Sequence, residues 1–101
     1  RAILLLCMPS STTSIYWIIY VLQSLKDGDR YIGITKDLNR RFAEHQNGEV
    51  FSTRGRRPLI IIYFEGCLSK DDAQRREKYL KTTGGRRFLA KRLKSYSINS
   101  R

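Results

Sequence analysis

The sequence has 101 residues, a length that suits one compact domain with one modest hydrophobic core. Hydrophobic residues make up 41% of it, which is ordinary for a globular protein and argues against overall disorder. Lys and Arg number 20 against 9 Asp and Glu, so the formal net charge is +11. A chain this basic attracts polyanions, because each phosphate that it neutralises releases counterions. Nucleic acid is therefore the favoured partner, ahead of an acidic membrane surface or a basic surface kept for solubility.

The two ends of the chain are expected to lie outside the folded domain. Residues 1–14 are predicted to be a leader, either disordered or artefactual, residues 15–97 to form the domain, and residues 98–101 to be a short tail. The apolar run at residues 2–6 is too short to span a bilayer, so no membrane partner is expected. Cys7 and Cys67 have no metal-ligand spacing and no evident disulfide role, which favours a reducing, cytoplasmic interior.

The first predicted elements are two strands joined in a hairpin. Apolar, aromatic and β-branched residues run almost without interruption from Ile15 to Leu25, which predicts a buried strand. A turn signal at residues 26–29 leads into a second apolar segment at residues 31–35. A four-residue loop between them would place Tyr20 and Tyr31 on the same face of the hairpin, because the pairing then has fixed parity.

The rest of the chain predicts helices around one more strand. A helix is expected from Asp37 to Asn47 with Gly48 as its stop, followed by a basic loop at residues 53–57 and a strand at residues 59–64. Ser69 is expected to begin a helix that runs to about residue 81. Residues 82–85 are expected to break it, and a basic helix follows from residue 86 to about 96. The order β-β-α-β-α-α predicts an α+β fold.

Helical periodicity points two polar side chains of the first helix toward the sheet. A helix turns by about 100° per residue, which places His45 within the apolar stripe and Arg41 at its border. Arg40 and Glu44 are expected on the opposite side. Polar groups that face a sheet are costly unless they are paired or line a cleft.

The second helix carries a carboxylate in its apolar stripe. Glu77 lies between Ala73 and Leu80 on the same face, and charged residues are almost never fully buried without a partner. Two interpretations stay open: a structural salt bridge with Arg41, or a metal site. A strand tyrosine is usually core and a lone histidine is usually structural. What favours function is that the tyrosines, Arg41, His45 and Glu77 are all expected to point toward one surface of the sheet.

Basic residues on loops and on the last helix are the candidates for nucleic-acid binding. They have a simpler interpretation as a solvated basic face. The residues are Lys36, Arg40, Arg54, Arg56, Arg57, Arg86, Arg87, Lys91, Arg92 and Lys94.

The motifs together resemble those of the GIY-YIG nuclease superfamily. The segment 18–20 (Ile-Ile-Tyr), followed after ten residues by 31–33 (Tyr-Ile-Gly), resembles the paired motif that names the family. The segment 35–45 matches its arginine-and-histidine helix, and the segment 75–81 resembles its glutamate helix. The resemblance covers about residues 17–96. In its size, the chain looks like the small stand-alone bacterial proteins related to the nuclease domain of the excision-repair endonuclease.

The resemblance implies a fold, a reaction and a site. The fold is a small antiparallel sheet flanked by helices, which with the predicted order means three strands and three helices. The reaction is metal-dependent hydrolysis of DNA phosphodiester bonds. Glu77 would bind one Mg²⁺ or Mn²⁺ and Arg41 would hold the scissile phosphate. Tyr20 or Tyr31 would orient or deprotonate the attacking water, and His45 would accept or relay its proton.

The sequence departs from the family pattern at two places. Ile18 stands where the family name has glycine, which is expected to alter strand packing rather than chemistry. Many members carry an asparagine after the glutamate helix, and the segment 86–89 offers no equivalent.

Low sequence specificity is expected, since no separate DNA-targeting segment is recognised. A role in DNA repair or recombination is expected. The structure of the DNA substrate stays open at this point: branched, single-stranded, nicked or damaged. The alternatives are a non-catalytic nucleic-acid-binding module with the nuclease fold and a basic protein bound to structured RNA. Glu77 discriminates between a nuclease and these alternatives, because a nuclease needs a metal-binding carboxylate and a binding module does not.

Overall fold

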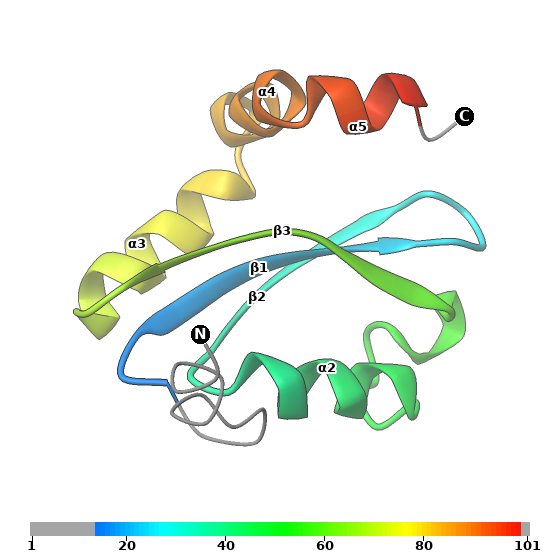
Figure 1. Cartoon of the computed structure of the whole chain (residues 1–101), viewed down its shortest axis with the longest axis horizontal. Coiled ribbons are helices and arrows are strands. Elements are labelled where there is room, and N and C mark those ends of the chain that lie inside the picture. The colour runs from blue at the N-terminus through cyan, green and yellow to red at the C-terminus, as the bar shows by residue number, and fades with distance from the viewer. Residues whose placement is uncertain (1–13, 100–101) are drawn as a thin grey trace, which may run out of the picture.

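The computed structural model describes residues 14–99, and the predicted leader lies almost wholly outside them (Figure 1). Two strands come first, β1 (Trp17–Ser24) and β2 (Arg30–Thr35), followed by α2 (Leu38–Gln46), the short 3₁₀ helix η1 (Arg54–Arg56) and β3 (Leu59–Cys67). Three helices complete the chain: α3 (Lys70–Leu80), α4 (Thr83–Arg92) and α5 (Lys94–Asn99). The strands form one antiparallel sheet in the order β2-β1-β3, so the α+β prediction is confirmed.

The hairpin between β1 and β2 sets the face on which the tyrosines lie. Its loop occupies residues 25–28, one residue earlier than predicted but of the same length, and the N–H of Ser24 donates to the carbonyl of Asp29 at 2.8 Å. Gly28 has a φ of 79°, which suits glycine in this tight turn. Tyr31 is the partner of Leu22, two residues from Tyr20, so the prediction that both tyrosines share a face is confirmed.

Helices cover both faces of the sheet and create two apolar clusters (Figure 1). On one face, the side chains of β1 pack against α3 and α4. On the other, they pack against α2. The buried members of the first cluster are Ile19, Val21, Ala73, Leu80 and Leu89. The second consists of Tyr20, Leu22 and Leu59, with Ile18, Tyr31, Leu38, Phe42 and Ile61 packed around them.

This two-sided arrangement corrects one prediction about the site. Glu77 does not share a sheet surface with the tyrosines, because alternate residues of β1 point to opposite faces. Ile19 and Val21 face α3, so Tyr20 faces α2. Since α3 also contacts the edge strand β2, the two groups can act together only around that edge.

The caps of α2 and α3 lie where the sequence predicts them. The Asp37 side chain accepts from the N–H of Arg40, and Gly48 follows the helix with a φ of 80°. Ser69 caps α3 by accepting from the N–H of Asp72. These local signals depend only on neighbours in the chain, which explains why the sequence alone locates both helices.

The glycine pair after α3 corrects a second prediction. Thr82 caps α4 by accepting from the N–H of Gly85 at 3.1 Å, so the helix begins at Thr83 and the glycines lie in its first turn. A Cβ on Gly85 would lie 2.1 Å from the carbonyl oxygen of Tyr79. Gly85, which has no side chain, therefore allows α4 to pack closely against the end of α3. The predicted last helix is also divided at Leu93 and extends to Asn99.

Strand β3 is longer than predicted, and this accommodates the unusual Ile18. The strand continues past Phe64 to Cys67 and pairs with the start of β1, where Ile18 lies opposite Gly66. The Ile18 Cδ1 lies 3.1 Å from where a Cβ on Gly66 would be. The side chain at position 18 thus fills space that a glycine on the neighbouring strand leaves open. Within residues 14–99, no helix is long and apolar enough to cross a membrane.

The two glycines of α4 give a matched test of this packing. Gly85→Ala should lower stability by about 1–3 kcal/mol, because backbone must move to admit the methyl group. Gly84→Ala should be neutral or stabilising by up to about 1 kcal/mol, since its nearest neighbour would be the Tyr79 ring at 3.5 Å and alanine favours a helix. Urea unfolding of both variants checks this, and equal midpoints would show that α4 does not approach α3 this closely.

Candidate active site

The centre of the candidate site is a buried chain of three polar side chains. The Tyr20 hydroxyl lies 2.9 Å from Nε2 of His45, and Nδ1 of His45 lies 2.7 Å from Oγ1 of Thr53. Their exposed fractions are 1%, 0% and 0%. In the tautomer with its proton on Nδ1, His45 donates to Thr53 and accepts from Tyr20. That arrangement gives the tyrosine proton an acceptor already in hydrogen-bond contact.

Gly33 makes room for this chain. A Cβ on Gly33 would lie 2.5 Å from the hydroxyl oxygen of Tyr20 and 2.6 Å from its ring. The Tyr20 side chain therefore crosses β2 at the glycine, on the way from the central strand toward the sheet edge. The glycine of the second motif is thus needed by the tyrosine of the first.

Thr53 is a member of the site that the sequence did not reveal. It lies in the loop after α2, and several hydrogen bonds hold this loop in place. The hydroxyl of Ser24 donates to the carbonyl of Arg56 at 2.7 Å, and the Gln46 amide both donates to and accepts from the backbone of Leu59 at 3.0 Å. Only its position just before the basic run distinguishes Thr53 in the sequence, and that signal carries no information about His45.

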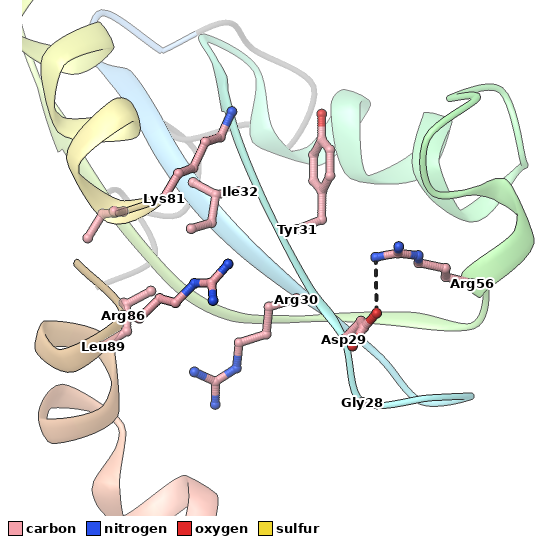
Figure 2. A pocket seen from close by; sticks show the side chains of 10 residues that line it. Gly28, Asp29, Arg30, Tyr31, Ile32, Arg56, Lys81, Arg86 and Leu89 are labelled. Atoms are coloured by element: carbon pink, nitrogen blue, oxygen red, sulfur yellow. Dashed lines mark ion pairs between the residues drawn. The ribbon is translucent and has the colours of Figure 1, made fainter. Parts of the chain in front are cut away.

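Tyr31 completes the aromatic cluster. Its ring centroid lies 6.3 Å from that of Tyr20 and 5.1 Å from that of His45. It is less buried than Tyr20 and also lines a pocket at the edge of β2 (Figure 2). Both rings pack against His45, but Tyr20 also hydrogen-bonds the histidine, whereas Tyr31 is the more exposed of the two.

Burial favours the neutral forms of Tyr20 and His45. It raises the pKa of Tyr20 to about 12, while a hydrogen bond from Arg41 opposes this and the neighbouring Tyr31 and Glu77 add to it. Burial, and then the positive charge of Arg41, lower the pKa of His45.

Arg41 points toward the site and Arg40 points to solvent, as the helical period predicts. Their side chains are 37% and 72% exposed. The Arg41 Nη1 lies 2.8 Å from Oε1 of Glu44, a residue expected to face away but close enough as an i,i+3 neighbour. A structural salt bridge between Arg41 and Glu77 is therefore wrong, since Glu77 pairs instead with Lys81 at 3.3 Å.

Glu77 lies half-buried on α3, as its place between two buried residues predicts. Its side chain is 20% exposed. Within residues 14–99, no group of three or more His, Cys, Asp or Glu side chains could hold a metal ion. A single accessible carboxylate fits Mg²⁺, which keeps several of its waters and takes its other ligands from substrate phosphates.

The predicted basic residues are spread over several surfaces. Arg54 lies over the Phe51 ring at 4.8 Å, Lys36 lies over Trp17 at 5.4 Å, and Arg57 donates to the backbone of Arg54. Five others are exposed on α4 and α5: Arg86, Arg87, Lys91, Arg92 and Lys94. Of these, Arg92 hydrogen-bonds Tyr63.

Two basic residues that line the pocket beside Tyr31 were not predicted. Arg30 and Lys81 line it together with Arg56 and Arg86 (Figure 2). The charge of Arg30 and Lys81 did not indicate that they line a pocket, because the pocket forms only where α3 and α4 pack beside β2.

Comparison with known proteins identifies the family of the chain. Residues 16–97 match the GIY-YIG catalytic domain, and the chain belongs to this family. It is a family of nucleases.

The relatives carry the name UPF0213 protein. One from Nitratidesulfovibrio vulgaris is 32% identical over 101 residues, covering 87% of this chain and 91% of the relative. Those from Desulfotalea psychrophila and Streptococcus pneumoniae are 37% and 44% identical, and the chain spans 60% and 64% of their lengths. A solution structure of a UPF0213 protein from Bacillus halodurans is 32% identical with a TM-score of 0.47, covering 75% of this chain and 83% of that one.

The buried histidine predicts a pH-dependent stability. Because the pKa of His45 is lower in the folded protein than its ordinary value near 6.5, the unfolded chain binds this proton first as pH falls. Stability should therefore be complete above about pH 6.5 and decline as pH drops from there toward the folded pKa. Urea unfolding between about pH 7.5 and 5 should show a shallower decline for His45→Gln than for wild type. Equal slopes would mean that His45 is not held neutral.

Proposed function

We propose that this protein is a divalent-metal-dependent endonuclease that hydrolyses DNA phosphodiester bonds with low sequence specificity, in repair or recombination. The observation that carries the proposal is the buried chain from Tyr20 through His45 to Thr53, with Arg41 beside the tyrosine oxygen. Such a chain is costly in a small core, because every polar atom in it needs a partner. A proton-transfer role explains why a polar chain stands where apolar side chains would pack.

The proton path follows from these contacts. The oxygen of a water molecule attacks phosphorus, and the water proton passes to Tyr20 as the tyrosine's own proton moves to Nε2 of His45. The 2.9 Å contact supports this transfer, and the nearby guanidinium of Arg41 stabilises the negative charge that develops on the tyrosine oxygen. The departing oxygen takes its proton from solvent. Tyr31, on the open side, orients the attacking water.

Arg41 and Glu77 supply the charges that a phosphoryl reaction needs. Arg41 is held by Glu44 and is 37% exposed, so its free N–H groups can grip a phosphate oxygen. Glu77 would hold one Mg²⁺ or Mn²⁺, and the bound ion would neutralise charge on the phosphate and its leaving oxygen. Low sequence specificity follows from a basic surface that meets the phosphates rather than the bases.

The two adjacent arginines of α2 test the assignment of Arg41. Arg41→Gln should abolish nicking of supercoiled plasmid in Mg²⁺ or Mn²⁺, because the phosphate loses its bidentate partner. Arg40→Gln removes the same charge from the solvent face and should leave nicking within a few-fold of wild type. Similar losses in both variants would contradict a specific role for Arg41.

Glu77 tests the proposed metal dependence. Glu77→Gln should remove nicking at every Mg²⁺ and Mn²⁺ concentration, while binding to DNA without metal persists or tightens as a negative charge disappears. Asp71→Asn removes a carboxylate from an exposed position on the same helix and should stay active. Folding is checked by thermal melting. A wild-type protein that binds DNA but never nicks it would favour the non-catalytic binding module.

A further inference from the structure

A pocket at the edge of β2 gathers basic side chains from distant parts of the chain (Figure 2). Its volume is about 660 Å³. Arg30 comes from β2, Arg56 from η1, Lys81 from the end of α3 and Arg86 from α4. Folding therefore brings four cations together that lie up to 56 positions apart in the sequence.

The protein neutralises these cations only in part. The one carboxylate in the lining belongs to Asp29, whose Oδ2 lies 3.6 Å from Nη1 of Arg56. Lys81 pairs with Glu77, which lies outside the lining. Arg86 forms no ion pair with any residue in the described part of the chain. Like charges held together repel one another, and an entering anion removes that repulsion.

Three aliphatic side chains form another part of the lining. Ile32 from β2, Leu80 from α3 and Leu89 from α4 form this part of the pocket. An inorganic anion has no apolar part that could contact these side chains. A nucleotide has a phosphate for the cations, and its sugar and flat, weakly polar base can contact the apolar lining. The volume lies within the range of about 300–1,000 Å³ that is usual for pockets holding one small ligand.

The pocket borders the candidate active site at two points. Tyr31 forms part of its lining and packs against His45, and Lys81 is the ion-pair partner of Glu77. We propose that the pocket receives one unpaired nucleotide together with its phosphate, next to the bond that is cut. That the nucleotide belongs to the DNA strand being cut rests on the proposed nuclease function. That the pocket binds a nucleotide does not.

This proposal narrows the substrate. A base inside a duplex is stacked and paired, so it cannot enter a pocket of this size without being extruded at a cost of about a few kcal/mol. A strand with an unpaired nucleotide, such as a flap, a fork or a single strand, enters without that cost. Preferred substrates should therefore carry an unpaired nucleotide beside the cleavage point.

A titration without metal tests the pocket apart from catalysis. The probes are thymidine 5′-monophosphate, thymidine and inorganic phosphate, observed through the methyl NMR signals of Ile32 and Leu89. Only the monophosphate should shift both signals in a saturable way. Equal shifts with inorganic phosphate would reduce the site to an anion site and overturn the proposal, as would the absence of any shift.

Two neighbouring arginines provide the matched variants. Arg86→Gln should weaken monophosphate binding by about five- to tenfold, the loss of one charge-assisted hydrogen bond. Arg87 is a candidate for general attraction of DNA but lies outside the lining, so Arg87→Gln, which removes the same charge from the same helix, should change monophosphate binding less than twofold. Equal effects would indicate general attraction to a basic surface and would overturn a specific pocket.

Oligonucleotides distinguish a strand from a free nucleotide as the natural occupant. A short single strand should shift the same two methyl signals, and a blunt duplex of equal length should not. Equal shifts by the duplex would contradict the requirement for an unpaired base, and a response to the mononucleotide alone would contradict a place on the substrate strand. An inactive protein that passes these tests would refute the nuclease proposal and leave the pocket standing.

Discussion

The hydrogen bond between Tyr20 and His45 is the constraint on which most of the α2 side of this protein depends. An imidazole with no exposed surface needs a partner at each ring nitrogen, because an unpaired buried polar group costs about 1–3 kcal/mol. Tyr20 supplies one partner and Thr53 the other. To place Thr53 there, the loop after α2 must fold back, and to let the tyrosine reach the histidine, β2 must carry Gly33.

The two sides of the sheet differ in the polarity of their buried residues. On the α3 and α4 side the buried residues are all apolar, and the helices approach closely enough to require Gly85. On the α2 side the cluster includes a tyrosine, and a polar chain runs through it. Apolar burial on the first side can offset the cost of keeping neutral polar groups buried on the second. A domain of this size has little additional apolar core that could stabilise the fold.

The sequence predicted what depends on neighbours along the chain and missed what depends on packing. Alternation and turn length placed Tyr20 and Tyr31 on one face, and helical period oriented Arg41 and His45. Period also placed Glu77 toward the sheet, but no local signal says which face of the sheet a helix covers. Thr53 and Gly85 have roles set by residues that reach them only after folding. For that reason a glycine pair that resembled a helix break proved to be a helix contact.

The edge position of β2 explains how groups on opposite faces of a sheet can serve one reaction. A central strand would separate the tyrosines from Glu77 by the full thickness of the sheet. At an edge the two faces meet, and adjacent strands are only about 4.8 Å apart. By crossing β2 at Gly33, Tyr20 reaches from the central strand toward that edge, where Tyr31 already lies. Lys81, just after α3, lines the pocket at this edge and pairs with Glu77, and α3 contacts β2 from the other face. A phosphate entering there would compete with Glu77 for Lys81, so arrival of the substrate would itself free the carboxylate that is proposed to hold the metal ion.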